Sequence, residues 1–107
     1  MTPKKNRINK KEADQVFATG RSVHSLALSF KFIFSKSGLP PKISFIAPKS
    51  VSKLASGRNY LRRKGYAALE RKLPLFPAGM IGVFIFKKNE YSVPAIEKEI
   101  EDILKRL

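Results

Sequence analysis

Cysteine and tryptophan are absent from this 107-residue chain, histidine occurs once, and acidic residues are few. Without cysteine there is no disulfide framework, no thiol nucleophile and no cysteine-ligated zinc or iron–sulfur site. No apolar stretch is long enough to form the core of a signal peptide or to cross a bilayer. We therefore expect an unexported, cytoplasmic protein that makes no membrane contact.

The shortage of acidic residues and histidine argues against an active site built from protein side chains. A two-metal nuclease needs several convergent carboxylates, but residues 1–72 contain only Glu12, Asp14 and Glu70. No carboxylate lies close in sequence to His24 to orient it as a general base, so a hydrogen-bonding role at a strand edge is favoured for it. We expect no catalytic residue and no metal ligand in this chain.

Positive charge is what the chain has in excess. It contains 22 Lys and Arg residues against 8 Asp and Glu, a net charge of +14. Residues 1–72 hold 17 basic and 3 acidic residues, whereas residues 73–107 hold 5 of each, so the whole excess lies in the first two thirds. Such an asymmetry is typical of a nucleic-acid-binding surface. An anionic membrane is less well matched, because the most basic segment has glycine and alanine where a membrane-bound helix needs bulky apolar residues.

The length and the apolar pattern predict a single RNA-binding domain over residues 1–107, with residues 1–8 as a flexible basic arm. The predicted elements are, in chain order, a helix from Lys10 to before Gly20, a strand at Leu26–Phe34, a turn at Ser37–Pro41, a strand at Lys42–Ala47, a long helix at Val51–Lys72, a buried strand at Met80–Phe86, a loop at Lys87–Tyr91 and an amphipathic helix from Val93. This order predicts an α+β fold, a two-layer α-β sandwich in which three helices pack on a small mixed sheet.

The predicted helix Val51–Lys72 has a packing face and a basic face. Glycines inside a helix cost about 1 kcal/mol each relative to alanine, so we expect a close approach of the helix to the sheet to offset that cost, with a functional hinge as the alternative. The predicted packing face consists of Leu54, Gly57, Leu61, Gly65 and Ala68.

The neighbouring arc of the same helix carries arginines without counter-charges. Arg58 and Arg62 stand one turn apart, as do Asn59 and Arg63, and like charges at this spacing destabilise a helix. Phosphate binding would offset that cost, because guanidinium groups chelate phosphate oxygens and release counterions. A solvated face, the alternative, normally mixes charges of both signs. The expected RNA contacts are Arg58, Asn59, Arg62 and Arg63, followed by Lys53, Lys49 and Lys64.

The stretch from Pro48 to Arg63 resembles the arginine-rich motif of the bacterial ribonuclease P protein subunit. That family has a lysine-bearing loop after a strand, then an alanine, Arg-Asn, two further residues and a basic pair. The matching residues here are Lys49, Lys53, Ala55, Arg58, Asn59, Arg62 and Arg63. The resemblance extends along nearly the whole chain, but Tyr66 stands where the family often has another arginine, and Ala13 about where it has an aromatic residue.

The resemblance implies a small protein that binds a large catalytic RNA and helps it cut the 5′ leader from precursor tRNA. The RNA would hold the Mg²⁺ ions of the reaction, and no protein partner is implied. The family fold contains a left-handed βαβ crossover through the arginine-rich helix, contrary to the usual right-handed preference. A cleft between the first helix and the sheet would take the single-stranded leader.

The sequence is compatible with such a cleft. One face of the first predicted strand is mixed in character, and we expect it to meet the leader through Ser29 and Lys31, together with Ser44 or Ile46 of the next strand. Phe17 is either a stacking surface for a base or a buried helix contact, and Tyr60 and Tyr66 are undecided between packing and sugar contact. The opposite, bulky face of the strand is expected to be core and consists of Leu28, Phe30, Phe32 and Phe34.

A second hypothesis remains open. A ribosome-associated or assembly protein that binds another structured RNA would need the same basic helix but would have no effect on precursor-tRNA cleavage.

Overall fold

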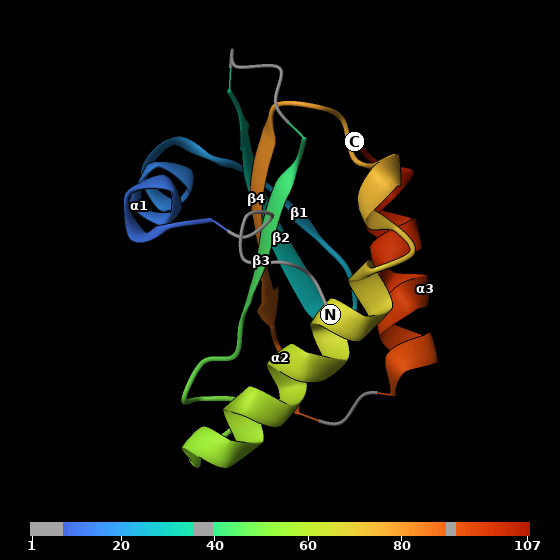
Figure 1. Cartoon of the computed structure of the whole chain (residues 1–107). Helices are drawn as coiled ribbons and strands as arrows, with labels where there is room; N and C mark the ends of the chain where they lie inside the picture. The colour runs from blue at the N-terminus through green and yellow to red at the C-terminus, as the bar shows by residue number, and fades with distance from the viewer. Residues whose placement is uncertain (1–7, 36–39, 90–91) are drawn as a thin grey trace.

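The structure, a computed structural model, describes residues 8–35, 40–89 and 92–107 (Figure 1). The predicted α+β sandwich with three helices and a small mixed sheet is confirmed. Most of the predicted turn at Ser37–Pro41, most of the predicted arm at 1–8 and the end of the predicted loop at Lys87–Tyr91 lie outside the described residues. The elements are α1 (Lys10–Thr19), β1 (Arg21–His24), β2 (Leu28–Phe34), β3 (Lys42–Ile46), α2 (Ala55–Leu69), a 3₁₀ helix (Leu73–Leu75), β4 (Met80–Phe86) and α3 (Val93–Leu104).

The four strands form one sheet in the order β1-β2-β4-β3, in which β4 is antiparallel to β2 and parallel to β3. Helix α2 connects the two neighbouring parallel strands β3 and β4. In Figure 1 both strands run downward, β3 lies nearer to the viewer than β4, and α2 rises on the right of the sheet. The crossover is therefore left-handed, as the resemblance implies and against the usual preference.

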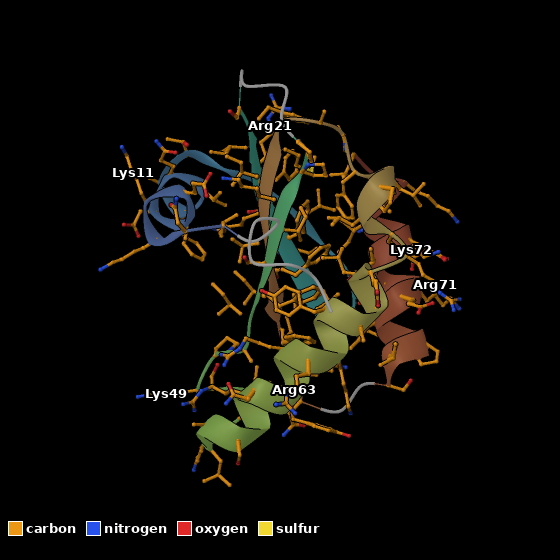
Figure 2. All side chains as sticks on the ribbon, viewed as in Figure 1. Lys11, Arg21, Lys49, Arg63, Arg71 and Lys72 are labelled. Atoms are coloured by element: carbon orange, nitrogen blue, oxygen red, sulfur yellow. The ribbon has the colours of Figure 1, made fainter. Side chains whose placement is uncertain are left out.

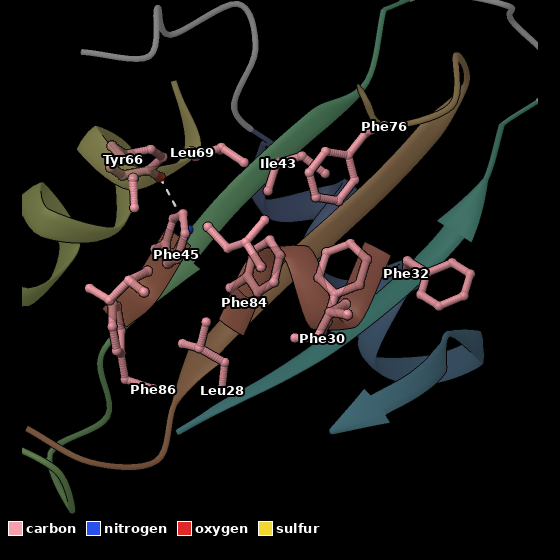
Figure 3. Packing of buried hydrophobic residues seen from close by; sticks show 14 of the residues in the cluster. Leu28, Phe30, Phe32, Ile43, Phe45, Tyr66, Leu69, Phe76, Phe84 and Phe86 are labelled. Atoms are coloured by element: carbon pink, nitrogen blue, oxygen red, sulfur yellow. Dashed lines mark hydrogen bonds between the residues drawn. The ribbon is translucent and has the colours of Figure 1, made fainter. Parts of the chain in front are cut away.

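Helices lie on both faces of the sheet (Figure 1). Helices α2 and α3 cover one face over the main core, in which the rings of Phe30 and Phe45 stack on Phe84 with centroids 4.3 and 5.0 Å away (Figure 3). Helix α1 adds a partial layer on the other face, where Val16 packs on Ile81 and Val83 of β4. Strand β4 is buried over nearly its whole length because it lies between both layers.

Helix α3 is fastened to the sheet by a buried carboxylate as well as by its apolar stripe. Glu99 is the one charged side chain that is buried among the described residues, and its Oε1 accepts hydrogen bonds from the backbone N–H of Ala27, at 2.8 Å, and from the hydroxyl of Ser25. These bonds compensate the cost of burying the charge. They also fix the bend that joins β1 to β2.

Two residues predicted to pack in the core are exposed instead. Strand β1 begins at Arg21, which is paired with Phe32 of β2, so no residue of β1 lies beside Phe34. Phe34 is therefore 61% exposed. The segment before α2 forms a turn, in which the Pro48 carbonyl accepts hydrogen bonds from the backbone N–H groups of Val51 and Ser52. The helix therefore begins only at Ala55. Leu54 precedes it, does not belong to its packing face, and is 71% exposed. The helix is shorter at both ends than the predicted Val51–Lys72 segment.

The expected close approach of helix and sheet is confirmed at one of the two glycines. A Cβ atom on Gly65 would lie 2.5 Å from the nearest ring carbon of Phe45 on β3. A Cβ atom on Gly57 would instead meet the Ser52 hydroxyl, in the turn before the helix, so this glycine does not contact the sheet. Of the two glycines, only Gly65 allows the close approach of α2 to the sheet.

This difference predicts opposite outcomes for two alanine substitutions. We expect Gly65→Ala to lower the free energy of unfolding by about 1–3 kcal/mol, because the methyl group overlaps a buried ring that has no room to move. Gly57→Ala should cause no loss, because the Ser52 hydroxyl can rotate away and alanine favours the helix by about 1 kcal/mol. Urea unfolding of both variants measures the difference, and equal destabilisation would contradict it.

Candidate nucleic-acid interface

Four of the predicted RNA contacts lie on α2 and are called the arginine group below: Arg58, Asn59, Arg62 and Arg63. They form two pairs that lie on different sides of the helix. The packing of Gly65 on β3 places Arg58 and Arg62 half-buried on one flank of the helix. Asn59 and Arg63 lie one position further round and are exposed. Figure 2 shows Arg63 and Lys49 at the same lower end of the molecule. The structure therefore brings the arginine group and the lysine-bearing turn before α2 onto one end of the fold.

Within the described residues, no carboxylate neutralises Arg58, Arg62 or Arg63. The ion pairs found there join Lys42 to Glu12, at 3.2 Å, and Lys72 to Glu101, at 2.5 Å. The hydrogen bond and positive charge of Lys72 lower the pKa of the Glu101 carboxyl. The acidic residues that do form ion pairs thus pair with lysines outside the arginine group, and the guanidinium charges remain available for an anion.

Arg58 also organises the turn that carries the lysines. Its Nη1 donates to the carbonyl oxygens of Ser52, at 3.1 Å, and Lys53, at 2.9 Å. Its Nε and Nη2 form no hydrogen bond with any other described residue, so part of the guanidinium fork stays free. Arg58 therefore holds the backbone beside the exposed Lys53 side chain while it can still meet a phosphate.

The other members of the predicted group have different surroundings. Arg62 donates through Nη2 to the side-chain oxygen of Asn59, which links the two flanks of the helix. Lys64 is separate from the arginine arc, because its Nζ lies 4.3 Å from the centroid of the exposed Tyr60 ring, a cation–π contact on the opposite flank. Tyr60 therefore presents its ring to solvent and to Lys64 rather than packing in the core.

Tyr66, which the sequence left undecided, is a packing residue. Its ring lies edge-on against Phe45 with centroids 5.2 Å apart and is 7% exposed. Its hydroxyl accepts a hydrogen bond of 3.2 Å from the backbone N–H of Phe45 (dashed in Figure 3). Because β3 is an edge strand, this bond satisfies a donor that would otherwise point away from the sheet.

The four residues predicted for the leader cleft lie on the α1 side of the molecule. Lys31 and Ser44 belong to one row across the sheet, since both are aligned with Val83 of β4. Phe17 is 43% exposed, which excludes the buried alternative, and its ring centroid lies 5.7 Å from the Lys31 Nζ. Phe17 and Lys31 therefore form one aromatic and cationic surface.

The two serines of this group already have partners. Ser44 Oγ accepts from the backbone N–H of Ile8 at 2.9 Å, and Ser29 Oγ is hydrogen-bonded to His24 Nδ1 at 2.9 Å. The bond to His24 agrees with the predicted hydrogen-bonding role of that histidine at a strand edge. Both serine hydroxyls are thus already engaged within the protein. Phe17 and Lys31 therefore offer more to an incoming RNA than the serines do.

A further cavity of the described part of the chain lies elsewhere. It has a volume of about 850 Å³ and is on the other side of α1, between Gln15 and Thr19 of the helix and Ile33 and Ser35 at the end of the sheet. None of the four predicted leader-cleft residues lines it. Helix α1 therefore separates an open face that carries Phe17 and Lys31 from this cavity, a division that the sequence did not predict.

The described side chains do not fit a magnesium site. No group of three or more histidine, aspartate or glutamate residues that could hold a metal ion occurs in the described ranges. Glu12, which lines the cavity on the other side of α1, is engaged with Lys42 and with the backbone N–H of Asn9 at the start of α1. In the same part of the chain, no helix is long and apolar enough to cross a membrane.

Comparisons with known proteins agree with the fold and with the family resemblance. The family model described as Ribonuclease P matches residues 2–107. The structure is similar to the RNase P protein of Staphylococcus aureus, with a TM-score of 0.81 at 16% identity over 94% of each chain. It is also similar to the RNase P protein of Thermotoga maritima, with a TM-score of 0.80 at 18% identity over 94% of this chain and 96% of that one. No curated protein matches the sequence.

Proposed function

The chain belongs to the ribonuclease P protein family, and from that premise we propose that it is the subunit that binds the catalytic RNA and the 5′ leader of precursor tRNA. The observation that carries the proposal is the row of arginines on α2 that no carboxylate neutralises within the described residues. A guanidinium row of this kind binds phosphates along an RNA backbone and gains free energy from counterion release.

In this proposal the chemistry belongs to the RNA. As the family resemblance implies, the RNA would hold the Mg²⁺ ions that drive the cleavage. Arg58, Asn59, Arg62 and Arg63 dock α2 on the RNA subunit, with Lys49 and Lys53 extending the contact from the preceding turn. Lys64 contributes at the helix flank. The chain acts in the cytoplasm as a single domain over residues 1–107.

The leader contact is proposed for the open face beside α1. The Phe17 ring offers a stacking surface for a base, and the Lys31 ammonium, 5.7 Å from its centroid, lies where the adjoining phosphate would pass. Ser29 and Ser44 complete the polar edge of this face. Precursor tRNA would thus be held by its leader while the RNA subunit holds the rest.

Reconstitution tests the proposed function directly. We expect the chain to restore 5′ leader removal when it is added to a bacterial ribonuclease P RNA at low magnesium, because its positive charge offsets repulsion between the RNA subunit and its substrate. The measurement is the rate of leader release from labelled precursor tRNA. Binding without stimulation would favour another structured-RNA-binding protein, and cleavage by the chain alone would indicate a protein catalyst.

The salt dependence of RNA binding tests the arginine row. We expect Arg58→Ala combined with Arg62→Ala to weaken binding and to flatten the plot of log affinity against log salt by about one unit for each lost phosphate contact. Filter binding over a series of salt concentrations measures the slope. Arg71→Ala is the control, since Arg71 is an exposed arginine that lies well away from Arg63 (Figure 2).

Because Arg58 also bonds to the preceding turn, its loss could act through the fold. Arg63→Ala removes this difficulty, since Arg63 is exposed and its side chain forms no hydrogen bond or ion pair with other described residues. An unchanged slope in both variants, with an unchanged circular dichroism spectrum, would contradict the proposed docking face.

The leader face makes a separate prediction. Phe17→Ala should weaken binding of precursor tRNA by about 1–3 kcal/mol, the value of one base stacked on an aromatic ring, and leave binding of leaderless tRNA unchanged. Affinities of the RNA-protein complex for the two substrates measure the effect. Phe34→Ala is the control, since Phe34 is exposed but shares the opposite face of β2 with Phe32, against whose ring it packs. An equal loss for both substrates would count against a leader contact.

A further inference from the structure

We propose that a groove at the end of the fold remote from the arginine row is a docking site for an acidic protein segment with bulky apolar side chains. The groove has a volume of about 410 Å³ and lies where β1, the end of β2, the 3₁₀ helix and the C-terminal end of α3 meet. This volume is enough for one or two apolar anchors of a bound segment.

The walls of the groove are exposed apolar side chains. Phe34, Leu75 and Leu107 are 61, 63 and 42% exposed, and all three line it. Solvent-exposed apolar side chains gathered in one place mark interaction sites more often than chance. The Phe34 ring is held edge-on against Phe32, with centroids 5.9 Å apart, so this wall is formed before a partner arrives. A preformed wall lowers the entropy lost on binding.

The rim of the groove selects the charge of the partner. Arg21 and Arg106 line it, and among the described residues no acidic side chain does. Arg106 donates through Nη1 to the carbonyl oxygen of His24, a bond that fixes this arginine beside β1. An apolar trough between two arginines is complementary to a segment that places carboxylates on either side of its apolar anchors.

Two other occupants fit the groove less well. RNA bases bind by stacking on aromatic rings, whereas this groove exposes one such ring, Phe34, among aliphatic walls. A second copy of the chain carries the same net charge of +14, and a two-fold arrangement would bring the arginine rims of the two copies together.

The position of the groove leaves the RNA-binding face free. Figure 2 shows Arg21 at the upper end of the molecule and Lys49 and Arg63 at the lower end. A protein partner in the groove and an RNA on α2 can therefore be bound at the same time. The proposal adds a protein partner where the sequence predicted none, and it does not depend on the proposed ribonuclease P function.

The test is selection from a random twelve-residue peptide library displayed on phage, with the full chain as target and excess transfer RNA present to occupy the basic surfaces. We expect the selected peptides to carry a net negative charge and at least two bulky apolar residues. Fluorescence anisotropy of the synthetic peptides should show affinity at least tenfold weaker for Leu75→Asp. The matched control Leu26→Asp, at a site 69% exposed but outside the groove, should bind as the wild type does.

A second variant protects the test against misfolding of Leu75→Asp. Arg21→Glu leaves the apolar walls intact, reverses one rim charge and should weaken the same peptides several-fold. The proposal is overturned if the selected peptides bind all variants equally or if transfer RNA displaces them. It is also overturned if sedimentation shows a wild-type dimer that Leu75→Asp dissolves. None of these readouts involves cleavage, so the ribonuclease P role stands or falls separately.

Discussion

The contact between Gly65 of α2 and the Phe45 ring of β3 is the constraint on which the rest of this molecule depends. It brings the helix backbone close to an edge strand and fixes the rotation of α2 about its axis. With that rotation set, Tyr66 closes the edge of β3 through its hydrogen bond to the Phe45 N–H. The same rotation directs the arginines away from the core. A bulkier residue at position 65 would therefore disturb both the packing and the basic surface.

The distribution of ion pairs explains how a chain of net charge +14 keeps a binding surface available. The acidic residues found in ion pairs are joined to Lys42 and Lys72, which lie outside the arginine group. Arg58 and Arg62 bond instead to neutral oxygens of the backbone and of Asn59, which orient the guanidinium groups without cancelling their charge. Orientation without neutralisation is what a phosphate-binding surface requires.

Sequence reasoning was most accurate where one interaction outweighs the others. The apolar run of β4, the alternation that buries Phe30 and the stripe of α3 all identify their elements, because burial of apolar area dominates there. It was wrong for Phe34 and Leu54, whose exposure depends on where neighbouring elements end. It also missed β1, a strand of four residues in which Val23 is the only apolar side chain, so that no apolar alternation marks it.

The sequence by itself determined the fold class, the basic helix and the surplus of arginine over acidic partners, since these follow from periodicity and composition along one segment. Only the tertiary structure decided that Tyr66 packs while Phe17 is exposed, that Arg58 braces the preceding turn, and that α1 divides one side of the sheet. Each of these depends on contacts between segments far apart in the chain. Local patterns carry no information about the distance and angle at which such segments meet.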